Sequence, residues 1–169
     1  MNYLVVVLRL VHILSGVFWV GGSIFLNFFV SPTVAATGDS GQQFMKHLVT
    51  KTNISVRISV AAVLTVLAGS WLYLIDSGGL DSAWSRSGPG LGFGLGGLFA
   101  IIGLVFGIMV GVATGKLGSL AASIKGKPTQ EQMNQIKAIQ GRLAVIGPIS
   151  TTALILTLIC MATARYWVF

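Results

Sequence analysis

Four long apolar stretches constrain this chain more than any other feature. A bilayer core about 30 Å thick is crossed by roughly 20 apolar residues in a helix, and residues 3–30, 55–75, 93–115 and 143–167 are four such stretches. Only 9% of the residues are charged, whereas about one quarter are charged in soluble domains. The sequence therefore predicts an all-α membrane protein, a four-helix bundle in which residues 1–169 form a single integral membrane domain.

The basic residues predict how these helices are oriented. The loop between the second and third spans carries Arg86 against Asp76 and Asp81. Cytoplasmic loops of membrane proteins are enriched in Lys and Arg, so we expect the other two loops in the cytoplasm of a bacterium, both termini outside, and the protein in the inner membrane. The net charge of +7 then indicates orientation, and no nucleic-acid partner is expected. The two basic loops and their flanks contain Lys46, Lys51, Arg57, Lys116, Lys125, Lys127, Lys137 and Arg142.

Two capping boxes predict helix starts outside the spans. Ser40 with Gln43, and Thr129 with Gln132, have the spacing of a hydroxyl cap and its reciprocal amide. We therefore expect the second and fourth helices to begin before the membrane and to extend beyond it on the basic side.

The third span carries small residues at spacings of three and four, which places them on one helix face. Such a face lets two helices approach closely, or offers a flat surface to a planar ring such as heme or chlorophyll. We expect a membrane protein partner or a second copy of the chain to pack on the part formed by Gly103, Gly107 and Gly111. The complete face contains Gly92, Gly96, Ala100, Gly103, Gly107, Gly111 and Gly115.

The first span carries a stripe of polar, small and aromatic residues that should face the bundle. Polar groups inside a bilayer are costly and mark functional sites. His12 has two interpretations: a neutral imidazole bonded to a neighbouring carbonyl or hydroxyl, or a ligand of a metal or tetrapyrrole. The stripe contains Arg9, His12, Gly16, Trp19, Ser23 and Asn27.

Depth in the membrane selects the partners that His12 can have. The helix from His12 to Val30 is roughly 27 Å long, so His47 lies at the opposite surface and cannot share one metal ion with His12. Cys160 and Met161 on the fourth span match the depth of His12. A His/Met pair is an established heme ligation, although a lone Met in an apolar helix is usually a packing residue.

Several kinds of activity are not expected. The chain has no Walker motif, no His-Glu-x-x-His and no Gly-x-Ser-x-Gly, and no Asp or Glu lies within a span. Proton-coupled transport and hydrolysis both need groups that are absent here, so we do not expect the chain to be an enzyme on its own.

The run HILSGVFWVGGSIFLNFFVSP, from His12 to Pro32, resembles the first helix of a superfamily of small membrane proteins. It includes CopD-like copper-resistance domains, uncharacterised four-helix proteins and HemJ-type protoporphyrinogen oxidases. The basic start of the second span, at Lys51 to Arg57, and the closing MATARY, from Met161 to Tyr166, are similar to the uncharacterised members. The resemblance implies a four-helix bundle and, from the HemJ type, a heme ligand at His12. It also leaves protoporphyrinogen oxidase activity of the HemJ type as an open alternative to the expectation that the chain is not an enzyme on its own.

These observations lead to three hypotheses. The first is a protein that binds heme b or a related tetrapyrrole such as chlorophyll through His12, for electron transfer or as a small subunit of a larger redox or photosynthetic complex. Met161 would be the second ligand, Arg9 and Arg165 would face the propionates, and Trp19 would line the site. The second is a cofactor-free subunit that packs through its glycine face. The third is a copper-handling protein of the CopD kind.

Overall fold

The computed structural model describes residues 3–80, 82–124 and 126–168, so that Asp81 and Lys125 lie outside it. All the regular structure in these ranges is helical. Four helical runs are long and apolar enough to cross a membrane: Tyr3–Ala36, Ile54–Asp76, Gly88–Ser123 and Gln130–Tyr166. The predicted all-α class with four spans is therefore confirmed, and three of the four helical runs are considerably longer than the spans read from hydropathy.

The first and last of these runs each combine several elements. The first passes through a wide π-helical turn, and the last ends in a tighter 3₁₀ turn. In chain order the elements are α1 (Tyr3–Phe25), η1 (Leu26–Val30), α2 (Ser31–Ala36), α3 (Gly38–Thr50), α4 (Ile54–Asp76), α5 (Ser82–Ser85), α6 (Gly88–Ser123), α7 (Gln130–Thr163) and η2 (Ala164–Tyr166).

One of the two predicted capping boxes is confirmed. The Thr129 hydroxyl accepts from the Gln132 backbone N–H at 3.2 Å, and the Gln132 side chain accepts from the Thr129 N–H at 2.9 Å. The prediction at Ser40 is wrong, because α3 already begins at Gly38 and makes no side-chain cap. Asn53, in the left-handed conformation with φ 52°, then separates α3 from α4. The second long helix therefore begins close to its apolar span.

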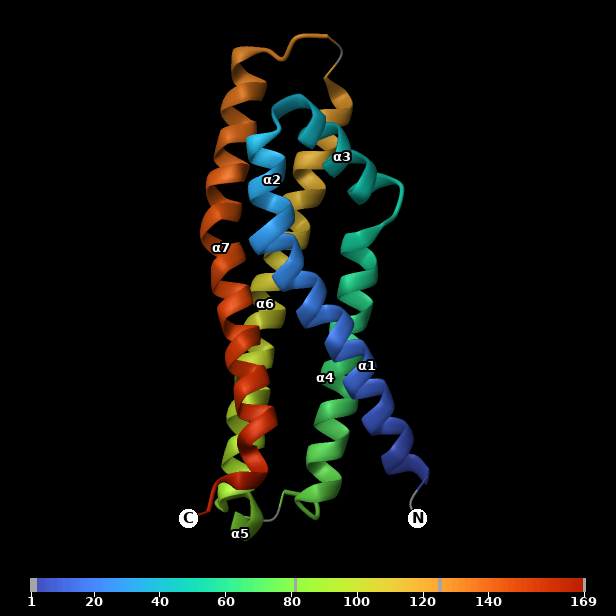
Figure 1. Cartoon of the computed structure of the whole chain (residues 1–169), viewed down its shortest axis with the longest axis vertical. Helices are drawn as coiled ribbons and strands as arrows, with labels where there is room; N and C mark the ends of the chain where they lie inside the picture. The colour runs from blue at the N-terminus through green and yellow to red at the C-terminus, as the bar shows by residue number, and fades with distance from the viewer. Residues whose placement is uncertain (1–2, 81, 125, 169) are drawn as a thin grey trace.

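The bundle consists of two helix pairs, α1 with α4 and α6 with α7, and the contacts within each pair are far more extensive than those between the pairs. Figure 1 shows both chain termini at one end, together with α5, and the two pairs diverge towards that end. We call it the terminal end. The opposite end carries α2, α3 and the α6–α7 connection, and we call it the basic end.

Glycines of α6 bring α7 close. A β-carbon at Gly103 would lie 2.6 Å from Leu154 Cδ2, and one at Gly92 would lie 2.7 Å from the Ala164 backbone. Tight helix–helix contact is thus confirmed for this part of the glycine face, within the chain itself. Gly103 is covered by Leu154 and is not available to a partner; Gly111 has no neighbouring atom within 4 Å of its β-carbon position.

The core lies where the two pairs meet. Leu154 of α7 is completely buried and Trp19 of α1 is 2% exposed. They pack with Val20 of α1 and with Ala61 and Ala62 of α4.

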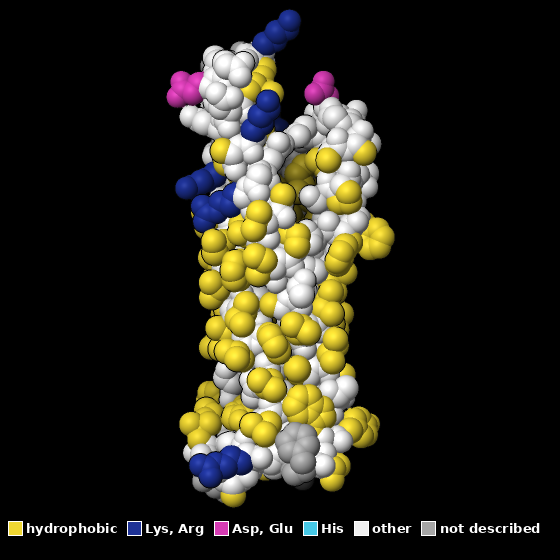
Figure 2. All heavy atoms as spheres, turned by 90° about the vertical axis from the view of Figure 1, so that its left-hand side faces the viewer, with side chains coloured by type: hydrophobic (Ala, Val, Ile, Leu, Met, Phe, Trp, Pro, Cys, Tyr) yellow, Lys and Arg dark blue, Asp and Glu magenta, His cyan; other side chains and the backbone are white. Residues whose placement is uncertain are grey.

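The outside of the bundle is apolar. Side chains such as Leu14, Val17 and Leu67 are more than 60% exposed. Figure 2 shows hydrophobic side chains over the middle of one face, with most of the visible Lys and Arg side chains gathered at the basic end. Exposed aliphatic side chains over the length of a span are the mark of a lipid-facing surface, so the protein is an integral membrane protein in contact with the bilayer.

Candidate functional site

His12 is held by the neighbouring helix α4. Its Nδ1 lies 2.8 Å from the backbone carbonyl oxygen of Thr65, in a partly buried position. A carbonyl oxygen can only accept, so Nδ1 carries the hydrogen and donates it. In the neutral imidazole Nε2 then has a lone pair, and no hydrogen bond to Nε2 is found among the described residues.

The α4 helix leaves space for this imidazole at Gly69. A β-carbon at Gly69 would lie 2.7 Å from His12 Cε1 and 2.9 Å from Nδ1. Contacts that close do not occur between real side chains, so any residue larger than glycine would displace the ring. The position of His12 therefore depends on two features of α4, a carbonyl group and a missing side chain.

A small polar contact continues along the same interface. Thr65 Oγ1 lies 2.9 Å from Ser15 Oγ and 2.7 Å from the carbonyl oxygen of Ala61. Gly16 packs on the methyl group of Thr65, 3.4 Å from its β-carbon position. Hydrogen bonds and small residues of this kind hold helices together in membranes. His12 thus belongs to the α1–α4 contact, as a neutral imidazole bonded to a neighbouring carbonyl. Its second ring nitrogen, Nε2, makes no hydrogen bond among the described residues.

Met161 lies against α6. A β-carbon at Gly96 would lie 3.0 Å from Met161 Cε and 3.2 Å from its Cγ, so the thioether covers Gly96. The adjacent Cys160 is buried at the same contact. His12 and Met161 therefore contact different helix pairs.

Their level along the bundle is nevertheless similar. Tyr73 lies one turn after Gly69 on α4, and its hydroxyl is 3.4 Å from the β-carbon position of Gly94 on α6. Gly94 is within one turn of the glycine that Met161 covers. His12 and Met161 therefore both lie in the part of the bundle nearer the terminal end.

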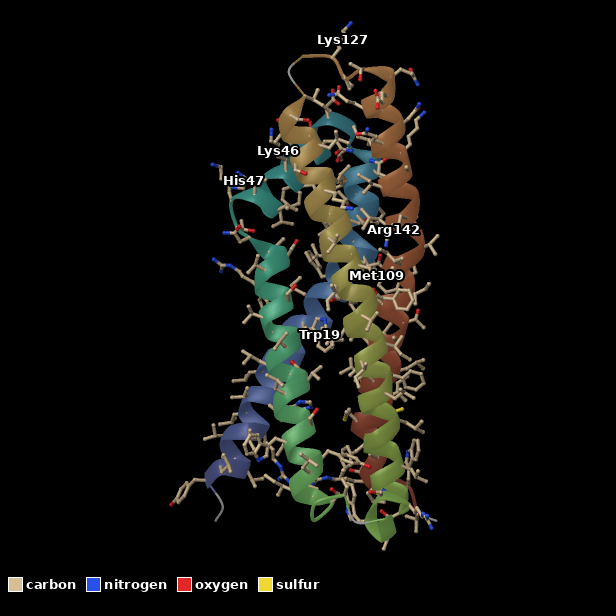
Figure 3. The ribbon with its side chains drawn as sticks, turned by 180° about the vertical axis from the view of Figure 1, so that it is seen from behind. Trp19, Lys46, His47, Met109, Lys127 and Arg142 are labelled. Carbon is tan, nitrogen blue, oxygen red and sulfur yellow. The ribbon has the colours of Figure 1, made fainter. Side chains whose placement is uncertain are left out.

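The other predicted site residues are spread over the molecule. Trp19 is in the core and also lines a cavity on the side of the basic end. Arg9 and Arg165 are both exposed, on segments close to the two termini and so towards the terminal end. His47 is exposed on α3 near the basic end, as Figure 3 shows, whereas His12 lies on the half of α1 nearer the terminal end.

The hydrogen bond of His12 is compatible with a histidine that holds a tetrapyrrole, whereas the glycine face of α6 offers no flat surface to such a ring. His12 has the orientation of a ligating histidine, which usually donates its other N–H to a carbonyl or carboxylate. Gly96 and Gly103 are covered by α7, and Gly92 is covered by Ala164 of η2, so none of the three offers a surface to a ring. Among the described residues, no three His, Cys, Asp or Glu side chains gather where they could hold a metal ion.

Sequence reasoning did not predict the cavity beside Trp19. It has a volume of about 160 Å³ and lies among α1, η1, α2, α3, α4, α6 and α7. Ser23 and Asn27, the inner members of the first-span stripe, line it, as do Gly107 and Gly111 of the α6 face. Both patterns were visible in the sequence, but only the fold shows that they face the same space.

No family model matches the chain, and no curated protein or solved structure was found to be similar to it. The resemblance of the first span to CopD-like and HemJ-like proteins stays a prediction. The function of the chain must be inferred from its own residues and their geometry.

Proposed function

We propose that the protein binds a b-type heme, or a related tetrapyrrole, through Nε2 of His12. It would serve electron transfer, alone or as a small subunit of a larger membrane redox or photosynthetic complex. One observation carries the proposal, the hydrogen bond of 2.8 Å from His12 Nδ1 to the Thr65 carbonyl. That bond selects the tautomer whose Nε2 can bind iron and orients the ring.

Two exposed arginines support a cofactor whose carboxylates lie at the terminal end. Arg9 and Arg165 are exposed near that end, and guanidinium groups pair well with carboxylates such as heme propionates. A bound heme would supply one-electron chemistry. The protein would contribute orientation through His12 and exclusion of water by the apolar side chains of the surrounding helices. Met161, at the level of His12, is the candidate for a second ligand.

The absorption spectrum of the purified protein tests this proposal. We expect a Soret band that His12→Ala abolishes or shifts, because the change removes the oriented imidazole. Met161→Leu keeps most of the volume over Gly96 and should lower the midpoint potential, since Met ligation raises it. An unchanged potential would leave His12 as the only ligand. If the protein carries neither a Soret band nor bound copper, the cofactor-free alternative replaces the proposal.

We also propose that the basic end faces the cytoplasm of a bacterium and that both termini face outward. The described basic residues near α3 and the α6–α7 connection support this orientation, because Lys and Arg are retained on the cytoplasmic side. Figure 3 places Lys46 and Lys127 at this end.

Labelling of single cysteines in intact cells should report this orientation. Lys127→Cys and Arg86→Cys place thiols at exposed positions near opposite ends of the bundle. A membrane-impermeant maleimide should label Arg86→Cys directly and Lys127→Cys only after the cells are permeabilised. The unaltered protein is a suitable blank, because its Cys160 is 8% exposed. The opposite labelling pattern would contradict the orientation.

A further inference from the structure

The cavity beside Trp19 has a mainly apolar lining that includes several polar side chains but no charged one among the described residues. Four of its hydroxyl groups already donate to backbone carbonyls: Ser23 to Trp19 at 2.8 Å, Ser59 to Ser55 at 2.9 Å, Ser150 to Gly103 at 2.9 Å and Thr151 to Gly147 at 3.1 Å. These groups present oxygen lone pairs to the cavity and have no hydrogen left to donate.

Other donors that line the cavity make no hydrogen bond within the described structure: the hydroxyls of Ser31, Ser55 and Thr114, and two nitrogen groups of the first helical run. Neither the indole N–H of Trp19 nor the amide of Asn27 has a hydrogen-bond partner among the described residues. The Trp19 side chain is 2% exposed. In the described structure, every side-chain nitrogen or oxygen that is fully covered by other atoms has a hydrogen-bond partner. The indole nitrogen therefore keeps access to open space, and we place that access at the cavity that Trp19 lines.

The position of Asn27 depends on two local features. It lies in the π-helical turn η1, a form of helix often found at functional sites. Its Oδ1 lies 3.0 Å from the β-carbon position of Gly147 on α7, so the amide extends across the bundle to a place where α7 has no side chain. An amide without a partner is costly in an apolar interior, which favours a polar occupant.

The size and polarity of the cavity limit what can occupy it. A cavity of 150 Å³ in another protein accepts one benzene molecule, so about 160 Å³ accepts a single six-membered ring with small substituents. The absence of charge in its described lining favours a neutral ligand, and the two nitrogen donors favour oxygen acceptors. We propose that the cavity binds a neutral, ring-sized ligand with hydrogen-bond-accepting oxygens, which is the chemistry of a membrane quinone head group.

This site is separate from that of His12. Trp19 lies seven residues after His12, roughly 10 Å further along α1, and the cavity extends from Trp19 towards the basic end, where α3 covers it. Ring binding in the cavity can therefore be tested with or without a tetrapyrrole at His12.

The glycines of α6 supply a matched pair of variants. Gly111 lines the cavity and has no atom within 4 Å of its β-carbon position, so Gly111→Leu should begin in open space and reduce the volume of the cavity. Gly115 is one turn further on, is equally free of neighbours and does not line the cavity. Gly115→Leu therefore makes the same chemical change outside the cavity and should not affect ring binding.

Duroquinone and durene are suitable probes, because they have the same tetramethylated ring and differ only in the two quinone oxygens. By equilibrium dialysis against the full chain in detergent, we expect saturable duroquinone binding about tenfold or more tighter than that of durene, the ratio expected for one net hydrogen bond. Gly111→Leu should abolish the saturable binding and Gly115→Leu should preserve it. Asn27→Leu should reduce the preference for duroquinone.

Three results would overturn the proposal. Equal binding of duroquinone and durene would mean an apolar cavity with no polar recognition. Saturable binding that survives Gly111→Leu would place the ligand elsewhere. No saturable binding of either ring would mean that the cavity holds no site for a ring of this size.

Discussion

Replacing Gly69 by alanine should displace His12 and weaken the contact between α1 and α4. The new β-carbon would lie 2.7 Å from His12 Cε1 and 2.9 Å from Nδ1, so the ring must rotate away from the Thr65 carbonyl. Overpacking of a tight contact typically costs about 1–3 kcal/mol, and the lost hydrogen bond adds about 1 kcal/mol. We expect the free energy of unfolding, measured by SDS titration in mixed micelles, to fall by about 2 kcal/mol or more.

A double-mutant cycle assigns that loss to the imidazole. In a His12→Ala background the ring is absent, so Gly69→Ala should cost little, and the two changes should be strongly non-additive. Gly97→Ala is the matched control, because a β-carbon at Gly97 has no neighbour within 4 Å. An additive cycle would show that the glycine is needed for another reason. Where heme is bound, Gly69→Ala should also alter the Soret band.

The four spans could be predicted because a helix that crosses a bilayer needs about 20 apolar residues in a row, and such a run is visible in any sequence. The cap at Thr129 was equally visible, since it depends on two residues three positions apart. The break between α3 and α4 was not, because it depends on one backbone conformation at Asn53. The pairing of α1 with α4 and of α6 with α7 could not be predicted either. The spacing of small and polar residues shows which face of a helix is buried, but not which other helix packs on that face.

The candidate site, too, could be predicted only in part. That His12 should face the bundle follows from its spacing with Gly16 and Trp19. Its acceptor, the Thr65 carbonyl, could not be predicted, because every residue type has a carbonyl group and only the register of two helices selects one. Gly69 belongs to the run Leu67-Ala68-Gly69, where small residues usually indicate helix packing, and nothing in the run itself shows that an imidazole occupies the space.

Leu154→Ala should cost more stability than any surface change. Leu154 is 0% exposed and packs on Trp19 and Ala62 from α7, at the place where the two helix pairs meet. Truncation of a buried leucine costs about 2–5 kcal/mol, the larger values where the surroundings cannot collapse into the space. We expect the upper part of this range in SDS titration, because this core lies where the two pairs meet and the contacts between the pairs are less extensive than those within them. Leu158→Ala, one turn further on α7 and 47% exposed, should change stability by less than about 0.5 kcal/mol.

Gly103 allows the same contact to be tested in the opposite direction. Alone, Gly103→Ala should destabilise the protein, because its β-carbon would lie 2.6 Å from Leu154 Cδ2. In the Leu154→Ala background that atom is gone, and the added methyl group fills part of the space that truncation leaves. Gly103→Ala should then stabilise the protein, by about 0.5–1 kcal/mol from helix propensity plus any gain in packing. A change of sign between the two backgrounds would show that small residues on α6 and large ones on α7 form one matched surface. The same sign in both would mean that the core joins the pairs through other side chains.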